Sequence, residues 1–193
     1  MMQARWQSAF ALAIGLSCSA CVRAPGPELE HRYHATQRQH EPERLLLRAR
    51  AFAAASDYTR AEQYLSLAQA SGAPEQEVAP LMIEVCIKDQ RYRAAIQHAE
   101  HYLRKHPRAY RLRFLKASLL AAVGDVAHAR EELERVLQTS PGHADAHFAI
   151  AVLLREDLGN HSEADSHFRE YLRLSPRGSH AEEANASLLE LMP

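Results

Sequence analysis

The chain has few glycines, few cysteines and almost no net charge. Its 193 residues include seven glycines and three cysteines, with a formal net charge of −1 at pH 7 when histidine is neutral. With 47% hydrophobic and 24% charged residues, this composition indicates a globular chain rather than a charged tail. The low charge leaves no electrostatic argument for binding nucleic acid or an anionic membrane. The cysteine content argues against a disulfide framework.

The sequence also lacks the short motifs that accompany common enzyme chemistry. It contains no Gly-x-Ser-x-Gly, His-Glu-x-x-His, Walker loop or dinucleotide fingerprint. Its many carboxylates are scattered over predicted helix surfaces, where a charge is usually only solvated. We therefore expect no enzymatic activity, no catalytic residue and no cofactor.

Histidine, by contrast, is plentiful, with twelve residues. His98 and His101 lie on one face of a predicted helix and His106 follows, a spacing that could hold zinc. No carboxylate or cysteine is clearly placed in the sequence as a further ligand. We therefore expect no metal site, and keep a metal-responsive histidine protein only as a third functional hypothesis.

Residues 1–20 differ in pattern from the rest of the chain. Arg5 gives a short basic start, Phe10–Leu16 is an apolar run of seven residues, and small residues with two cysteines follow. That run is too short to span a bilayer as a helix and suits a secretory signal. The segment resembles a bacterial lipoprotein signal peptide, in which a cysteine after small residues is cleaved and lipidated. An ordinary signal peptide or an uncleaved start is the alternative.

The resemblance favours Cys21 as the lipidated residue, because Ser19 and Ala20 precede it, and leaves Cys18 as the alternative. Val22 rather than aspartate follows Cys21, which in this lipoprotein class favours the outer membrane. The resemblance thus implies a palmitate-bearing anchor in the bacterial cell envelope, with the protein facing the periplasm. Membrane contact is expected through this anchor only.

Residues 21–41 contain two prolines, a glycine and many polar side chains, without a sustained apolar stripe. We expect a flexible tether there, with helical character near Leu29–Gln39. As a flexible coil such a segment spans roughly 25 Å.

Four alanines recur at a nearly fixed interval. Ala61, Ala95, Ala129 and Ala164 are separated by 34, 34 and 35 residues. A period of this length indicates a stack of helical hairpins that share one continuous interior. The repeats are 42–75, 76–109, 110–143 and 144–178. The extra residue of the last repeat falls between Leu154 and Gly159, at a predicted helix end.

The residues around these alanines resemble the tetratricopeptide repeat. Small or apolar residues occupy the eighth position, as Ala49, Ile83, Ala117 and Ala151. Three repeats have a proline near the end, as Pro107, Pro141 and Pro176. The fifteenth position is glycine only in the last two repeats, as Gly124 and Gly159, and is Ser56 and Gln90 in the first two. The resemblance implies an all-α solenoid of four tetratricopeptide hairpins.

Two further patterns refine the expected helices. Residues 179–193 begin with Ser179 and Glu182 at the spacing of a capping box and continue with an apolar stripe. We expect a C-terminal capping helix that closes the last repeat. Pro80 interrupts the second repeat, so we expect its first helix to start near Ala79–Pro80.

In this family the first helix of each hairpin lines a concave, partner-binding face. The positions selected here as a groove combine apolar and charged side chains, and are Leu46, Arg50, Glu84, Lys88, Arg111, Phe114, Phe148, Val152 and Arg155. The paired lysines and asparagines that hold a C-terminal carboxylate in some members are absent. We expect an apolar helix or an extended segment of a partner protein. The alternative is that Phe114 and Phe148 only pack between hairpins.

Together these resemblances predict a lipid-anchored scaffold that assembles an envelope complex, such as a type IV or Tad-type pilus or a secretin. The lipoprotein of the outer-membrane barrel assembly machine has the same plan, so the resemblance does not select the machine. The alternative function is a periplasmic adaptor or regulator of a cell-wall enzyme. The partner and the oligomeric state stay open at this point.

Overall fold

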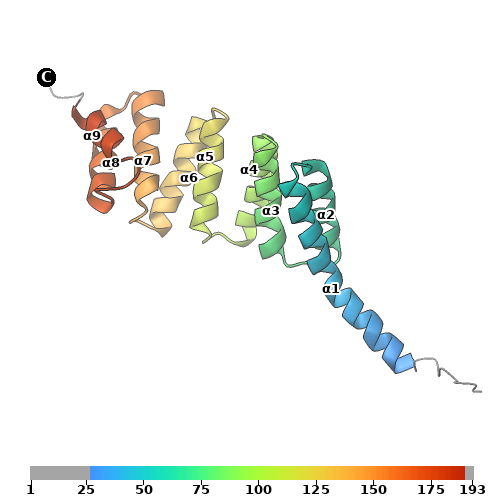
Figure 1. The fold of residues 1–193 in the computed structure, drawn as a ribbon. Coiled ribbons are helices and arrows are strands. Elements are labelled where there is room, and N and C mark those ends of the chain that lie inside the picture. Colours follow the sequence, from blue (N-terminus) through green and yellow to red (C-terminus); the bar gives the residue numbers. More distant parts are fainter. Residues whose placement is uncertain (1–26, 190–193) are drawn as a thin grey trace, which may run out of the picture. The chain divides into compact units, whose positions relative to one another are not determined.

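The computed structural model describes residues 27–189, with side chains from residue 41 to residue 188, and every regular element in this part is a helix (Figure 1). The elements are α1 (Pro27–Ala54), α2 (Tyr58–Ala70), α3 (Glu75–Lys88), α4 (Tyr92–Lys105), α5 (Tyr110–Ala122), α6 (Val126–Thr139), α7 (Ala144–Val152), the π-helical turn η1 (Leu153–Asp157), α8 (His161–Leu174) and α9 (Ala181–Leu189). The predicted signal peptide and its cysteines, Cys18 and Cys21, lie outside the described residues. Among the described helices, none combines the length and the apolar character needed to cross a membrane.

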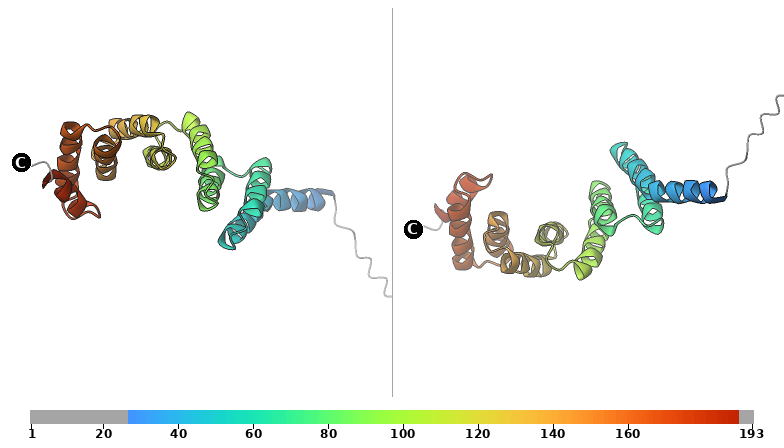
Figure 2. Two further views of the ribbon diagram at one scale, coloured as in Figure 1. Left: turned by 90° about the horizontal axis from the view of Figure 1, so that it is seen from above. Right: turned by 90° about the horizontal axis from the view of Figure 1, so that it is seen from below.

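Consecutive helices of the described chain form four hairpins, followed by α9. Helices α3 and α4, α5 and α6, and α7 and α8 pack as antiparallel pairs, and α1 shares a buried cluster with α2. Each hairpin also contacts the next, through α2 and α3, α4 and α5, and α6 and α7. From α2 to α9 the hairpins follow one another in chain order in both views of Figure 2. The chain divides into two compact units between Gln37 and Arg38, and the second contains the part of α1 from Arg38 onward together with all the later helices.

Helix α1 begins earlier than the sequence indicated. Residues 27–41, expected to form a flexible tether with a helix near Leu29–Gln39, are helical from Pro27 onward. Proline is accepted at a first helical position because its missing N–H has no partner there. The following segment is rich in glutamate, glutamine and arginine, which favour helix. Pro42 lies inside α1 and has no N–H for the carbonyl of Arg38, where the two compact units divide.

The four periodic alanines are buried inside their hairpins. Each stands in the first turn of the second helix of its hairpin, and all four have 0% of their surface exposed. A larger side chain there would force the paired helices apart, at a cost of about 1–3 kcal/mol. Their burial confirms the structural reason inferred for the period.

The turn inside each hairpin has one backbone form. In each hairpin one turn residue has a positive φ. These residues, in chain order, are Ser56 (59°), Gln90 (58°), Gly124 (82°) and Gly159 (64°). The predicted caps follow directly, because Asp57, Asp125 and Asn160 accept hydrogen bonds from the backbone N–H groups three residues later. In the second hairpin Arg91 takes the same position without a side-chain cap.

The extra residue of the fourth repeat is absorbed within a helix. Leu158 N–H donates to the carbonyl of Leu153 at 3.1 Å, an i to i−5 bond that widens the last turn into η1. The insertion predicted between Leu154 and Gly159 therefore takes the form of a π-helical turn. A π turn holds one more residue than an α turn, so side chains within it change direction.

Helix α3 does not start at Pro80 as expected. It starts at Glu75 after the cap residue Pro74, and Pro80 lies inside it. Glu75 and Glu77 stabilise the first turn through their charge near the helix N-terminus. Pro80 removes only the bond to the carbonyl of Gln76, so the helix continues past it.

The buried core divides into two clusters that meet on α3. The first includes Leu46, Leu65 and Val85, and the second runs from Ile83 and Cys86 to the C-terminal hairpin and α9. Adjacent faces of α3 thus belong to different clusters. The single continuous interior expected from the period is replaced by two clusters that share one helix.

Candidate partner-binding groove

A hollow of about 380 Å³ lies between α1 and α3, the first helices of the first two hairpins. Its base and walls are apolar, and its rim is charged. The lining residues are Ala49, Arg50, Ala53, Ala54, Leu65, Leu81, Glu84, Val85 and Lys88. We call this hollow the α1–α3 groove. Three of the nine residues predicted to bind a partner, Arg50, Glu84 and Lys88, line it.

The groove exists because α1 presents small side chains toward α3. Ala49 and Ala53 are four residues apart and lie on one face of the helix, and Ala54 lies beside that face. Ala49 and Leu65 are buried below, with 1% and 0% exposed, while Ala54 is exposed at the wall. The space that a larger residue at these positions would fill is open to a partner side chain.

The rim of the α1–α3 groove carries two cations and one carboxylate. Lys88 Nζ lies 2.7 Å from Glu84 Oε1, one turn earlier on α3. The hydrogen bond and the charge of Glu84 raise the pKa of Lys88, which keeps its ammonium charged. Arg50 is exposed on α1. The rim therefore favours a segment that places an acidic residue beside an apolar anchor.

The other apolar residues predicted to bind a partner serve the core or the helix contacts. Leu46 has 3% of its surface exposed and belongs to the first buried cluster, so it is not available to a partner. Phe114 packs on His143 with ring centroids 4.8 Å apart, and Phe148 stacks on His180 at 4.2 Å. These contacts fit the alternative that both rings pack between neighbouring elements. Val152 is half-buried against the second cluster.

Arg155 was predicted to line the groove, but it lies in η1 and its side chain makes internal contacts. Its side chain is only 12% exposed and its guanidinium lies 5.2 Å above the ring of Phe168. It also donates to the backbone carbonyl of Ser187 in α9 and lies 3.8 Å from Asp165. The π turn directs this arginine toward α8 and α9, where it holds the C-terminal helix. Arg111, the last predicted residue, is exposed on α5.

A buried charge cluster is the main feature that the sequence reading missed. Glu132 on α6 is 4% exposed, and its carboxylate accepts hydrogen bonds from Arg113 at 2.6 Å and Lys116 at 3.1 Å. Burial alone would raise the pKa of Glu132, but these two cations outweigh it and hold the pKa below its usual value. Lys116 also lies 3.0 Å from Glu100 on α4, so the cluster joins the second and third hairpins.

The sequence contained a signal for this cluster. Glu132 falls on the same helical stripe as the buried Ala129, Leu133 and Val136, a position where a lone carboxylate is costly. The general expectation that carboxylates lie on solvated helix surfaces does not hold for Glu132. Because Glu132 is matched by cations from a neighbouring helix, we assign the cluster a structural role.

Comparison with known proteins now identifies the architecture. The family model described as tetratricopeptide repeat matches residues 87–142 and 114–179. Residues 87–179 of this chain belong to the tetratricopeptide repeat family. The match begins at Ile87, so it covers the turn and second helix of the second hairpin and the two later hairpins, while the first hairpin lies outside it.

Solved structures confirm the fold along most of the chain. A tetratricopeptide repeat protein from Parabacteroides merdae is 20% identical with a TM-score of 0.69, over 77% of this chain and 59% of its own. The chain therefore spans less than two thirds of that protein. YrrB, described as having an unusual peptide-binding site, is 19% identical with a TM-score of 0.61, over 72% of this chain and 71% of its own. MamA from Desulfovibrio magneticus is 20% identical with a TM-score of 0.62, over 82% and 91%.

At these identities the likeness is one of fold. No curated protein matches the chain in sequence. The predicted all-α solenoid of four tetratricopeptide hairpins and a C-terminal helix is confirmed. Repeat scaffolds of this kind are protein–protein interaction folds and are generally non-catalytic.

Proposed function

We propose that this tetratricopeptide repeat protein is a lipid-anchored scaffold of the bacterial envelope, and that its α1–α3 groove binds a segment of a partner protein. The observation on which the proposal rests is the groove itself, with an apolar base and a charged rim on the first helices of two adjacent hairpins. A hollow of this size accepts an anchoring side chain of a helix or an extended peptide.

The chemistry of the groove defines the partner segment. Leu65 and Val85 lie at the base, so the anchor is an apolar side chain. Arg50 and Lys88 at the rim attract an acidic residue beside that anchor. Glu84 repels a second acidic residue placed close to it. We therefore expect a segment with one large apolar residue flanked by a carboxylate.

The lipoprotein-like start of the chain supports an envelope role. An anchor on Cys21, or alternatively on Cys18, would hold the scaffold at the outer membrane with the hairpins facing the periplasm. We propose that the process served is assembly of a type IV or Tad-type pilus or of a secretin. The support is the combination of a lipidation signal with a binding scaffold that lacks catalytic motifs.

Site-specific crosslinking in cells tests the groove. A photoreactive amino acid at position 54 lies at the groove wall, and one at exposed position 138 on α6 is the matched control. We expect a specific adduct from position 54 only. The double variant Arg50→Glu, Lys88→Glu should weaken partner binding about tenfold, equivalent to about 1.4 kcal/mol, and reduce the adduct accordingly. Arg169→Glu on α8 should leave binding unchanged. Equal adducts from positions 54 and 138 would contradict binding in the groove.

The identity of the crosslinked protein tests the process. Secretin or pilus subunits support assembly, while a peptidoglycan enzyme supports the adaptor alternative. A deletion strain with intact pili, secretion and outer-membrane protein levels would exclude envelope assembly. Labelling with palmitate tests the anchor, and we expect it to be lost in Cys21→Ser and kept in Cys18→Ser.

A further inference from the structure

Three side chains with metal-binding atoms converge where the first two hairpins meet. Glu62 comes from α2, Cys86 from α3 and His98 from α4, and their ligand atoms all lie within 4.8 Å of one another. Cys86 Sγ donates to Glu62 Oε1 at 3.7 Å. Ligand atoms around one tetrahedral zinc ion lie about 3.6 Å apart, given bond lengths of about 2.0–2.3 Å. The three side chains would therefore need to move only slightly toward one another to coordinate a single ion.

We propose that Glu62, Cys86 and His98 form a binding site for Zn²⁺. Cys86 takes the core position that Leu120 and Leu154 take in the next two repeats, so the repeat accounts for its burial. It does not account for the carboxylate of Glu62 and the imidazole of His98 beside the thiol. A thiolate, an imidazole and a carboxylate are the ligand types that zinc prefers. Calcium and magnesium require oxygen ligands and do not fit this set.

The surroundings of the cluster suit a metal with one open coordination position. Glu62 and His98 line an open hollow of about 760 Å³ together with Met82, which gives an ion a path from solvent. Cys86 is fully buried behind them. Three protein ligands leave a fourth position on the solvent side for water or for a side chain of a bound partner.

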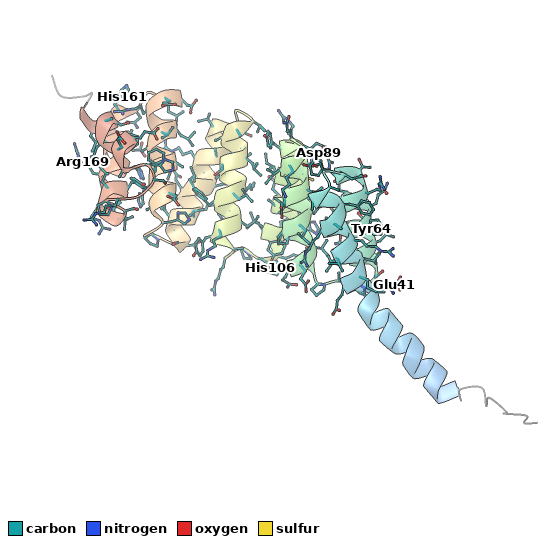
Figure 3. All side chains as sticks on the ribbon, viewed as in Figure 1. Glu41, Tyr64, Asp89, His106, His161 and Arg169 are labelled. Carbon is teal, nitrogen blue, oxygen red and sulfur yellow. The ribbon has the colours of Figure 1, made fainter. Side chains whose placement is uncertain are left out.

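An outer group orients the carboxylate toward the thiol. Arg91 Nη2 lies 2.8 Å from Glu62 Oε2, and Arg91 Nε donates to Asp89 Oδ2 at 2.6 Å, at the end of α3 where Figure 3 labels Asp89. With Oε2 held by Arg91, Oε1 faces Cys86. Two anionic ligands balance the charge of Zn²⁺, and Asp89 balances Arg91. Such outer partners fix ligand orientation in metal sites.

Binding at this site releases one proton. Burial and the neighbouring Glu62 raise the pKa of Cys86 to about 11, so the thiol is neutral at pH 7. Burial lowers the pKa of His98, which leaves its imidazole neutral and able to coordinate. When Zn²⁺ binds, the S–H bond breaks, the Zn–S bond forms and the proton passes to solvent without oxidation or reduction. Affinity therefore rises about tenfold per pH unit between pH 7 and pH 8.

This cluster differs from the grouping that the histidine spacing suggested. The sequence paired His98 with His101 and found no cysteine or carboxylate as a further ligand. In the structure His101 Nε2 lies 3.5 Å from Glu75 Oε1, while Cys86 and Glu62 approach His98. The two additional ligands come from other helices and share no spacing with His98 that a motif search would find.

The test uses the full chain with Cys18→Ser and Cys21→Ser, so that Cys86 is the only thiol. Zn²⁺ is titrated against a chromophoric chelator, and Co²⁺ is then added as a spectroscopic probe. We expect one ion per chain, a thiolate-to-cobalt charge-transfer band and the visible bands of a tetrahedral site. A pH indicator should record one proton released per Zn²⁺ bound.

Single variants locate the ion. His98→Gln and Glu62→Gln alter half-buried side chains and should weaken Zn²⁺ binding beyond the roughly 10- to 100-fold that loss of an outer partner costs. His101→Gln, one turn away on the same helix, is the matched control and should not change it. Circular dichroism verifies that each variant is folded. Cys86→Ser, which alters a buried residue, serves only to confirm loss of the charge-transfer band.

Three results would overturn the proposal. The first is the absence of saturable binding of one ion per chain, and the second is a cobalt spectrum without a thiolate band. The third is equal weakening by His98→Gln and His101→Gln, which would place the ion on the exposed face of α4. None of these outcomes bears on the α1–α3 groove, so this inference stands apart from the proposed function.

Discussion

Within each hairpin, one residue in the turn adopts a left-handed backbone whichever side chain it carries. Gly124 and Gly159 do so without strain, but Ser56 and Gln90 have φ of 59° and 58°. A left-handed conformation costs a residue with a Cβ about 1–2 kcal/mol. The turn imposes it, since Arg91 N–H must reach the carbonyl of Cys86 at 2.9 Å, as Asp125 N–H reaches that of Leu120. The first two hairpins therefore store strain that the last two avoid.

Replacing Gln90 by glycine should relieve this strain. The gain is partly offset because glycine has more freedom in the unfolded chain, so we expect the free energy of unfolding to rise by about 0.5–1 kcal/mol. Urea unfolding followed by circular dichroism measures it. Gln90→Ala keeps the Cβ and should bring no gain, and Gly124→Ala should destabilise. A Gln90→Gly variant no more stable than the parent would contradict strain at this turn.

The paired histidines of the last hairpin predict a loss of stability in acid. His147 Nε2 donates to the carbonyl of Pro141, so its Nδ1 is unprotonated and accepts from His167 Nδ1 at 3.0 Å. Burial, then the neighbouring His147, lowers the pKa of His167, although Glu163 and Glu134 oppose this and Arg130 reinforces it. The unfolded chain therefore binds more protons than the folded one below about pH 6.5.

We expect the contribution of neutral His167 to the free energy of unfolding to be complete above about pH 6.5 and to decline as the pH falls through its lowered pKa. Urea unfolding between pH 7.5 and pH 5 measures it. His167→Gln should flatten the dependence, whereas His161→Gln, which alters the exposed histidine labelled in Figure 3, should not. Equal slopes in the parent and in His167→Gln would exclude this pair as the cause.

At the scale of elements, α9 is held at both ends by the last hairpin. Tyr171 on α8 is fully buried, and its Oη accepts from the backbone N–H of His180, just before α9. Arg155 in η1 donates to the carbonyl of Ser187 near the other end of α9. The capping box read from Ser179 and Glu182 stays a prediction. The helix closes the array because two internal side chains reach its backbone.

Gly178 is the position where this docking leaves no room. A Cβ there would collide with Ser175 Oγ and Tyr171 Oη. We expect Gly178→Ala to displace Tyr171, cost about 1–3 kcal/mol and speed hydrogen exchange in α9. Gly142→Ala is the matched control, since its nearest atom, Leu174 Cδ2, would lie 4.0 Å away. Similar exchange in the two variants would show that Gly178 does not govern docking.

At the scale of the whole molecule, the helical array has two buried clusters joined through α3. Val85 faces the first cluster and Ile83 and Cys86 face the second. In a repeat array each unit contacts only its neighbours, so stability is a sum of local terms. The α1–α3 groove lies over the first cluster, and the proposed zinc site lies at α3, where the two clusters meet. An ion there would tie α2, α3 and α4 together.

Large-to-small changes should reveal this division. Leu65→Ala removes a fully buried side chain of the first cluster and should cost about 2–5 kcal/mol. We expect faster hydrogen exchange in α2 and α3, with α5 to α8 close to the parent. Leu133→Ala, in the second cluster, should give the opposite pattern. Exchange that rises equally in all helices would mean that the array unfolds as one cooperative unit.

The sequence by itself determined the repeat. The alanine period, Gly124 and Gly159, and the caps Asp57 and Asp125 are local signals, because helix spacing and turn geometry depend on neighbours in the chain. They predicted the hairpins and the reason for the buried alanines. They did not predict where α1 and α3 begin. Proline lacks a backbone N–H, which removes one hydrogen bond but does not prevent a helix from continuing through it.

The tertiary structure alone decided which side chains are available. Leu46 and Arg155 were read as groove residues, yet one is in the core and the other holds α9. Glu62 and Cys86 meet His98 because three helices from two hairpins pack together. Such meetings depend on how each helix is rotated against the next. A periodic pattern specifies which face of a helix is buried, and packing selects the neighbours that this face meets.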